Sequence, residues 1–246
     1  MEETKNVSLY PRHSLIKTIW LHLFPGILIV ILFYFVSPVI INMGFPSTMS
    51  LLLCMLLVII LFELGHLYYI GKKINKRFSL KGVIFFKNKI KPLHFSLIVV
   101  FLFAFTVAAI TFIQRIEILN FREYFSFLPV WFFYGEDFSG FSKSIIIFSA
   151  IFRLISDGMI IPVIEELYFR AYLLPRLSHF KYAAPVINAL LFAIYHLWQP
   201  WNIVILVIVS LIYCYAAWLT KNFYISLALH GLINFISALI FLISLL

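Results

Sequence analysis

The chain has 246 residues, of which 63% are hydrophobic and only 12% charged, with a mean hydropathy of +1.04. Soluble domains carry about 25% charged residues, so this sequence has too little polar surface to cover a water-soluble globule. We therefore predict an all-α polytopic membrane bundle that forms a single domain, residues 1–246. The net charge of +9 is assigned to membrane topology and not to nucleic-acid binding, because basic residues of membrane proteins gather in cytoplasmic loops.

Seven apolar runs predict seven membrane spans, since a spanning helix needs about 20 mostly apolar residues. The runs lie at 20–41, 49–70, 93–113, 145–175, 182–198, 203–220 and 223–245. A further aromatic run at 125–134 has ten residues, too few to span as a helix, so we expect an interfacial or re-entrant segment there. Cys54 and Cys214 lie inside apolar runs and are expected to be small buried side chains without a disulfide framework.

The loop charges predict the orientation of these spans. Residues 71–92 carry eight Lys and Arg and no acidic residue, which places this loop in the cytoplasm. Alternating spans then put the N-terminus inside and the C-terminus outside, with only Arg115, Arg122 and Lys143 among the loop cations on the outer side. We therefore expect a multi-pass protein of the cell membrane that is in contact with membrane lipids.

A few ionisable side chains remain inside the apolar segments. A charged group at the bilayer centre costs about 2.5–3.5 kcal/mol on insertion scales, so such residues are functional candidates. They are Glu63, His66, Arg153, Asp157, Glu165, Glu166, His196 and His230.

The fourth span contains the sequence IEELYFR, in which two adjacent glutamates precede an arginine. Glu166 and Arg170 are four residues apart in the favourable order for a helical ion pair. Adjacent helical residues point about 100° apart, so Glu165 has no such partner. We expect Glu166 to pair with Arg170 and Glu165 to be able to act as a general base.

Two later spans carry further polar residues at helical spacing. Phe192 shares a helix face with His196, and His230 shares one with Asn234. At 1.5 Å per residue, Glu165, His196 and His230 lie about 16, 21 and 13 Å from the cytoplasmic ends of their helices. These depths predict that the three side chains meet in one buried cavity. The alternative is that each polar residue only hydrogen-bonds a neighbouring helix and so holds the bundle together.

Two other pairs are assigned structural roles. Arg153 and Asp157, four residues apart, are expected to pair with each other or with water near the outer interface. Glu63 and His66, close to the basic loop, are expected to form an interfacial pair outside the site.

The motifs EExxxR, FxxxH and HxxxN occur in this order between residues 145 and 240. Over this segment the sequence resembles the CPBP family of intramembrane proteases, also called the CAAX protease and bacteriocin-processing or Abi family. The resemblance implies hydrolysis of a peptide bond within the membrane by a water molecule that glutamate and histidine activate.

The resemblance also implies a role for each matching residue. Glu165 would be the general base, with His196 positioning or activating the water, while His230 and Asn234 would stabilise the oxyanion or orient the substrate. Glu166, Arg170 and Phe192 would support the shape of the site.

Zinc is the alternative to a metal-free mechanism. Glu165, His196 and His230 could supply three zinc ligands and leave a fourth position for water. The sequence has no HExxH motif, and the nearest approach, FELGH at 62–66, has Phe62 in place of the first histidine. We therefore expect no cofactor.

The leading hypothesis is an endopeptidase that cuts a peptide or lipidated protein near its membrane-embedded end, in peptide maturation, CAAX-type processing or bacteriocin self-immunity. The alternative is a non-proteolytic membrane partner or immunity protein that binds a sensor or peptide through the same polar cluster. A proton-coupled transporter is disfavoured, because such proteins often show two related halves, and no internal repeat is visible.

Overall fold

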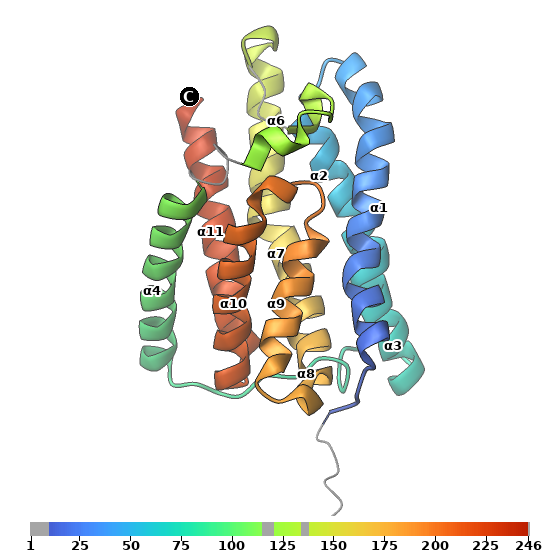
Figure 1. Ribbon diagram of the computed structural model, residues 1–246, viewed down its shortest axis with the longest axis vertical. Coiled ribbons are helices and arrows are strands. Elements are labelled where there is room, and N and C mark those ends of the chain that lie inside the picture. The colour runs from blue at the N-terminus through green and yellow to red at the C-terminus, as the bar shows by residue number, and fades with distance from the viewer. Residues whose placement is uncertain (1–9, 115–120, 134–137, 246) are drawn as a thin grey trace, which may run out of the picture.

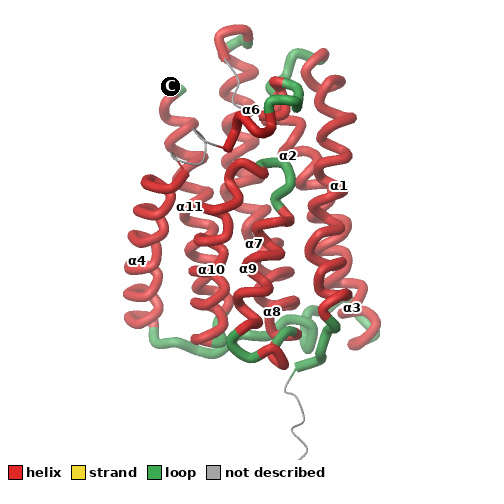
Figure 2. The backbone as a smooth tube through the Cα atoms, viewed as in Figure 1, coloured by secondary structure: helices red, strands yellow, loops and turns green. Residues whose placement is uncertain are grey.

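The computed structural model describes residues 10–114, 121–133 and 138–245. These residues form an upright bundle of helices whose connections gather at its two ends (Figures 1 and 2). The described chain begins at one end, and α11 finishes at the opposite end (Figure 1). Arg115, expected outside, and Tyr134, the last residue of the predicted interfacial run, lie outside the described residues.

Within the described residues, six helical stretches are long and apolar enough to cross a membrane, which confirms an all-α polytopic bundle. The stretches are Leu15–Asn42, Ser47–Asn75, Pro92–Ile113, Lys143–Arg176, Pro200–Thr220 and Phe223–Ser244. The labelled helices in them are α1 (Leu15–Asn42), α2 (Ser47–Val58), α3 (Gly65–Asn75), α4 (Pro92–Ala109), α6 (Lys143–Ile155), α7 (Ile161–Glu165), α8 (Leu174–Arg176), α10 (Ile203–Thr220) and α11 (Phe223–Ser244).

The predicted fifth span, 182–198, is shorter than expected. Its helix, α9 (Ala183–Tyr195), has 13 residues and is therefore about 20 Å long, against a hydrocarbon core of about 30 Å. The chain leaves the helix at His196 and turns back into α10, below the upper ends of α1 and α6 (Figure 1). Hydropathy alone extends this span because the turn itself contains Leu197, Trp198 and Trp201.

The predicted interfacial run does not form a span. It folds as short helical turns at Arg122–Phe125 and Val130–Phe133. The ring of Phe133 lies 4.8 Å from that of Trp201, so the segment covers the turn between α9 and α10. Its position relative to a membrane stays a prediction.

The fourth predicted span is a continuous helical stretch that passes through both glutamates, as expected. It contains π-helical turns at Ser156–Ile160 and Glu166–Leu173, a form of helix often found at functional sites. The stretch ends at Arg176 and not before Pro175, because this proline lies at the start of the final turn, α8, where a missing N–H is tolerated.

Local sequence signals fix where helices begin and how closely they pack. The side chains of Ser14, Ser142 and Asn222 accept backbone N–H groups in the first turns of α1, α6 and α11. In α1, any Cβ atom at Gly26 would collide with the backbone carbonyl of Tyr195. This glycine therefore allows α1 and α9 to approach closely, which places Tyr195 beside α7.

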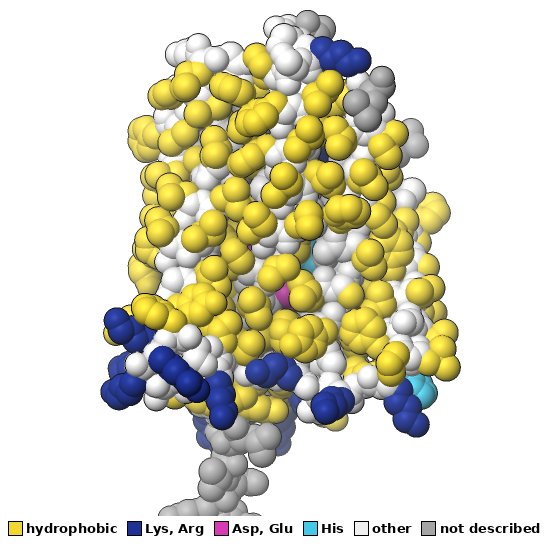
Figure 3. Space-filling view, turned by 180° about the vertical axis from the view of Figure 1, so that it is seen from behind, with side chains coloured by type: hydrophobic (Ala, Val, Ile, Leu, Met, Phe, Trp, Pro, Cys, Tyr) yellow, Lys and Arg dark blue, Asp and Glu magenta, His cyan; other side chains and the backbone are white. Residues whose placement is uncertain are grey.

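Lysine and arginine side chains gather at the end of the bundle where the described chain begins, whereas the side face is almost entirely hydrophobic (Figure 3). The loop between α3 and α4 crosses this end and buries Val83 and Phe86. Its backbone is tied to the bundle, because Phe85 N–H donates to the Ala171 carbonyl at 2.8 Å and Phe223 N–H donates to the Phe86 carbonyl at 2.7 Å. We call this the lysine-rich end.

Candidate active site

The predicted ion pair between Glu166 and Arg170 is present and fully buried. The Arg170 Nη1 atom lies 3.3 Å from Glu166 Oε1, and neither side chain is exposed. The guanidinium also lies 3.9 Å from the centre of the Phe192 ring, a favourable cation–π arrangement. Because His230 Nδ1 is 3.0 Å from the same Glu166 oxygen, the pair also orients this imidazole.

The neighbouring glutamate has a different environment. Glu165 is 1% exposed, and its Oε1 atom accepts a hydrogen bond from the Tyr195 hydroxyl at 3.2 Å. Its other oxygen, Oε2, lies 3.7 Å from His230 Nε2. His230 therefore stands between the two glutamates, with one ring nitrogen facing each.

His196 is the residue at which α9 ends. Its Nδ1 atom lies 2.8 Å from the backbone carbonyl of Phe192, and since a carbonyl only accepts, Nδ1 is the donor. In the neutral ring this leaves Nε2 as a hydrogen-bond acceptor. The Phe192 ring meets the imidazole edge to face, with ring centres 4.6 Å apart, and so fixes its orientation.

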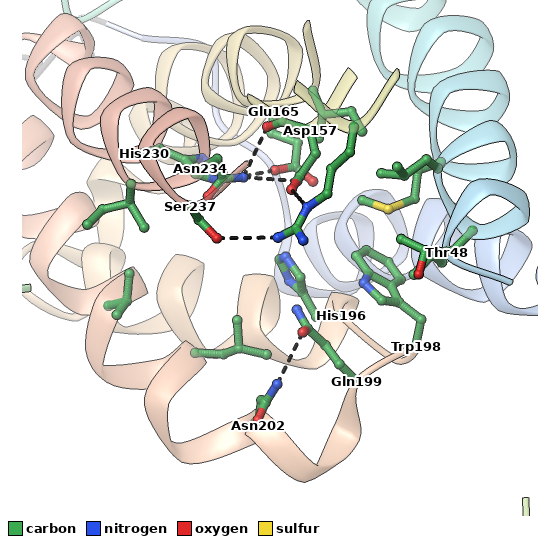
Figure 4. Close-up of a pocket in the computed structure, with 18 of the residues that line it drawn as sticks. Thr48, Asp157, Glu165, His196, Trp198, Gln199, Asn202, His230, Asn234 and Ser237 are labelled. Atoms are coloured by element: carbon green, nitrogen blue, oxygen red, sulfur yellow. Dashed lines mark hydrogen bonds and ion pairs between the residues drawn. The ribbon is translucent and has the colours of Figure 1, made fainter. Parts of the chain in front are cut away.

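The four predicted catalytic residues line one cavity of about 480 Å³: Glu165, His196, His230 and Asn234. The close-up in Figure 4 shows them on three separate elements around a common space. Phe192 also lines the cavity, whereas Glu166 and Arg170 lie behind it. The structure thus brings the predicted residues together; their catalytic roles stay predictions.

The predicted Arg153–Asp157 pair is confirmed, with the two side chains 3.5 Å apart. Both side chains also line the cavity, which was not expected. Asn234 Nδ2 donates to the Asp157 carboxylate at 3.2 Å and to its backbone carbonyl at 3.3 Å, and Arg153 Nη2 lies 3.3 Å from Ser237 Oγ (Figure 4). Arg153, Asp157, position 161 and Glu165 follow one another at intervals of four residues and therefore share one helix face. This spacing was the sequence signal that could have placed the pair on the same side as Glu165.

The expectation for Glu63 and His66 is wrong. Glu63 is fully buried and lies beside the Tyr195 hydroxyl, the same group that contacts Glu165. His66 Nε2 is 2.9 Å from the hydroxyl of Tyr172 instead. The two residues are therefore not an interfacial pair, and Glu63 adjoins the site.

The side chains as placed do not fit a zinc site. Among the described residues, no set of three or more His, Cys, Asp and Glu side chains is arranged to hold a metal ion. The cluster formed by Glu165, Glu166 and His230 is instead organised by hydrogen bonds and by Arg170.

A comparison with known families supports this interpretation of the motifs. Residues 146–236 match the family model described as Type II CAAX prenyl endopeptidase Rce1-like. No curated protein and no solved structure matches the chain. The matched segment contains all three motifs and every residue of the predicted site. The chain is therefore a multi-pass membrane protein whose residues 146–236 form an Rce1-like domain of the CAAX protease family.

Proposed function

We propose that the protein is an intramembrane endopeptidase that hydrolyses a peptide bond with a water molecule activated by Glu165 and His196. The observation that carries this proposal is the position of Glu165, at the inner end of the cavity and between Tyr195 and His230. The substrate is a peptide or a lipidated protein segment at the membrane.

In the proposed reaction, Glu165 takes a proton from water while the water oxygen bonds to the carbonyl carbon of the substrate. The carbonyl electron pair moves onto oxygen. When the tetrahedral intermediate collapses, the C–N bond breaks, and the proton held by Glu165 passes to the leaving amine. The free Nε2 atom of His196 accepts a hydrogen bond from the same water and orients it.

His230 is the better placed of the two candidate oxyanion donors. Its two ring nitrogens each face a carboxylate oxygen, Nδ1 at 3.0 Å from Glu166 Oε1 and Nε2 at 3.7 Å from Glu165 Oε2, and a carboxylate only accepts, so we assign both nitrogens as donors. Its Nε2–H can then donate to a developing oxyanion. The amide of Asn234 already donates to Asp157, so we assign Asn234 the task of holding the cavity wall.

The proposal is metal-free. Glu165 Oε1 accepts a hydrogen bond from the Tyr195 hydroxyl, and His230 Nδ1 faces Glu166; this arrangement supports proton transfer by the side chains themselves. No step of the proposed reaction involves a metal ion.

The test is cleavage of quenched-fluorescence peptides by the purified protein, using one peptide prenylated at a C-terminal CAAX box and one unmodified. Glu165→Gln and His196→Ala should each lower the rate by about 100-fold or more, the usual contribution of general acid–base groups. Glu123→Gln, at an exposed carboxylate of the 122–125 turn, is the control and should cleave normally.

Retained cleavage in both site variants would remove the proposed catalytic pair. A cellular phenotype that survived Glu165→Gln would favour peptide binding without hydrolysis.

A further inference from the structure

The cavity extends from Glu165 in one direction only. On the helix that carries Glu165, the lining residues recur at every fourth position and stop at this glutamate: Ser149, Arg153, Asp157, Ile161 and Glu165. This helix runs towards the lysine-rich end, where Arg176 closes it. Every lining residue on it therefore lies at or beyond Glu165 on the side away from the lysine-rich end.

The other helices show the same limit. In α2 the lining residues end at Met55, although the helical stretch continues to Asn75 at the lysine-rich end. In α11, which starts at that end, they begin only at His230 and continue to Phe241. In α10 they end at Tyr213, before the helix reaches the lysine-rich end at Thr220.

Exposure changes along the cavity in the same direction. Glu165 is 1% exposed, whereas the side chains of Arg153 and Asp157, further along the helix, are 28% and 24% exposed. Ser237, which receives the hydrogen bond from Arg153, is exposed. Polar side chains therefore line a path that opens away from the lysine-rich end.

A packed layer separates Glu165 from the lysine-rich end. The next residues of the helix are almost completely buried: Glu166, Phe169, Arg170, Leu173 and Leu174 are each 0–1% exposed. Below them, the loop between α3 and α4 is hydrogen-bonded to the helix at Ala171 and to the start of α11. A peptide arriving at this end would have to displace both the packed layer and the loop.

A second cavity, of about 410 Å³, does not provide a route. It lies between α1 and the helical stretch 47–75, and its lining includes Trp20, Phe62 and Tyr168. It shares no lining residue with the first cavity. Tyr195 and Glu63, both fully buried, adjoin Glu165 on the side of this stretch.

We propose that the substrate reaches Glu165 from the end of the bundle opposite to the lysine-rich end. Basic loops mark the cytoplasmic side of membrane proteins, so this entrance is extracytoplasmic. The substrate class is then a peptide segment of an exported or membrane-inserted protein that is presented on the outer side. This inference rests on the proposed function.

The test is the accessibility of two matched serines of α11 that lie on either side of His230. Ser237→Cys and Ser226→Cys are treated with a membrane-impermeant sulfonated maleimide, in intact cells and in inside-out vesicles. Ser226 is fully buried and serves as the inaccessible control. The native Cys54 and Cys214 are 3% and 0% exposed, so labelling of the wild type measures the background. Lys89→Cys, in the exposed lysine-rich loop, marks the cytoplasmic side.

We expect Ser237→Cys to be labelled in intact cells at least about tenfold above the wild type, because thiol reactions need an accessible thiolate. Ser226→Cys should stay at background from both sides, and Lys89→Cys should react only in inside-out vesicles. Labelling of Ser237→Cys from the cytoplasmic side alone, or from neither side, would overturn the proposal.

This measurement is independent of catalysis. The same labelling pattern is expected in a Glu165→Gln background, so a loss of the proposed function does not alter it. Conversely, a protein that cleaves peptides but admits the reagent only from the lysine-rich side would keep the proposed function and lose this inference.

Discussion

Two ion pairs on one helical stretch show how different the two halves of the bundle are. Both pairs join residues four positions apart, with charged atoms 3.5 Å apart in Arg153–Asp157 and 3.3 Å apart in Glu166–Arg170. The first pair lies in the cavity wall with about a quarter of each side chain exposed, and the second is completely buried.

The difference assigns the pairs distinct tasks. A buried pair must remain intact, because removing one partner leaves an uncompensated charge in a low-dielectric interior. A partly exposed pair is screened and contributes little to stability, so its charges remain available to a ligand. This contrast supports the proposed function and the proposed entrance: the half with the lysine-rich end would hold the site in place, and the other half would admit the substrate.

The largest predicted effect is on stability in the packed half. Arg170→Met should lower the free energy of unfolding by about 3–5 kcal/mol, because Glu166 is left buried and unpaired. Arg153→Met should cost less than about 1 kcal/mol. Denaturant unfolding in detergent measures both, and equal losses would remove the distinction between the two halves.

A double variant sharpens this test. Replacing both partners, with Glu166→Leu and Arg170→Met, should recover most of the stability, since an apolar pair carries no desolvation cost. Peptide cleavage should stay low in the double variant, because His230 no longer has the Glu166 carboxylate that orients it.

The next prediction concerns activity in the open half. Asp157→Ala removes the carboxylate that holds Asn234 and should lower kcat by about tenfold, the equivalent of one charge-assisted hydrogen bond. Asp157→Asn keeps an acceptor at this position and should recover part of the rate. Equal kcat values for the two variants would show that loss of the hydrogen bond to Asn234 does not cause the decrease in rate.

A smaller effect is expected at the boundary between the halves. Tyr195→Phe removes the hydroxyl that donates to Glu165, and the loss of about 1 kcal/mol should lower kcat by about fivefold. The midpoint of thermal unfolding should change little, because the ring remains packed against Phe169 and Phe192. A large loss of stability would instead indicate a structural role for the hydroxyl.

The smallest effect is a pH dependence at the lysine-rich end. Burial, followed by the charges of Lys17 and Arg176, lowers the pKa of His13 from 6.5 to about 3; His66 and His22 add smaller contributions in the same direction. The unfolded chain therefore binds a proton that the folded chain does not, and stability should fall as pH drops from about 6.5 towards 3.

His13→Phe should reduce this slope, measured as the change in unfolding midpoint between about pH 8 and about pH 5. Thr106→Val, at another fully buried residue that carries no titratable group, is the control, and its pH slope should match the wild type. An unchanged slope in His13→Phe would assign the acid sensitivity to other groups.

Most of the bundle was predictable, because long apolar runs have few folded solutions in a membrane. Part of the site was predictable, because counting residues from the helix ends gives the depth of each side chain. Similar depths predicted that Glu165, His196 and His230 lie close together. Glu63 was misplaced because its helix continues to Asn75, beyond the last strongly apolar residues. Counted from Asn75, Glu63 lies about 18 Å deep, close to the depth of Glu165.

Other features could not be read from hydropathy or spacing. The turn that follows His196 also contains large apolar residues, so hydropathy does not show that α9 ends there. Only the tertiary structure shows this end. The asymmetry of the cavity depends on which side chains from many separate elements leave space between them. Spacing within one helix carries no information on that volume.

The most direct test of the proposed metal-free hydrolysis is peptide cleavage by metal-stripped wild-type protein beside metal-stripped Glu165→Gln, with metal content verified in both. We expect the stripped wild type to keep its full rate and the variant to lose about 100-fold or more. Loss of wild-type activity on stripping with recovery on added zinc, or cleavage by Glu165→Gln at the wild-type rate, would contradict it.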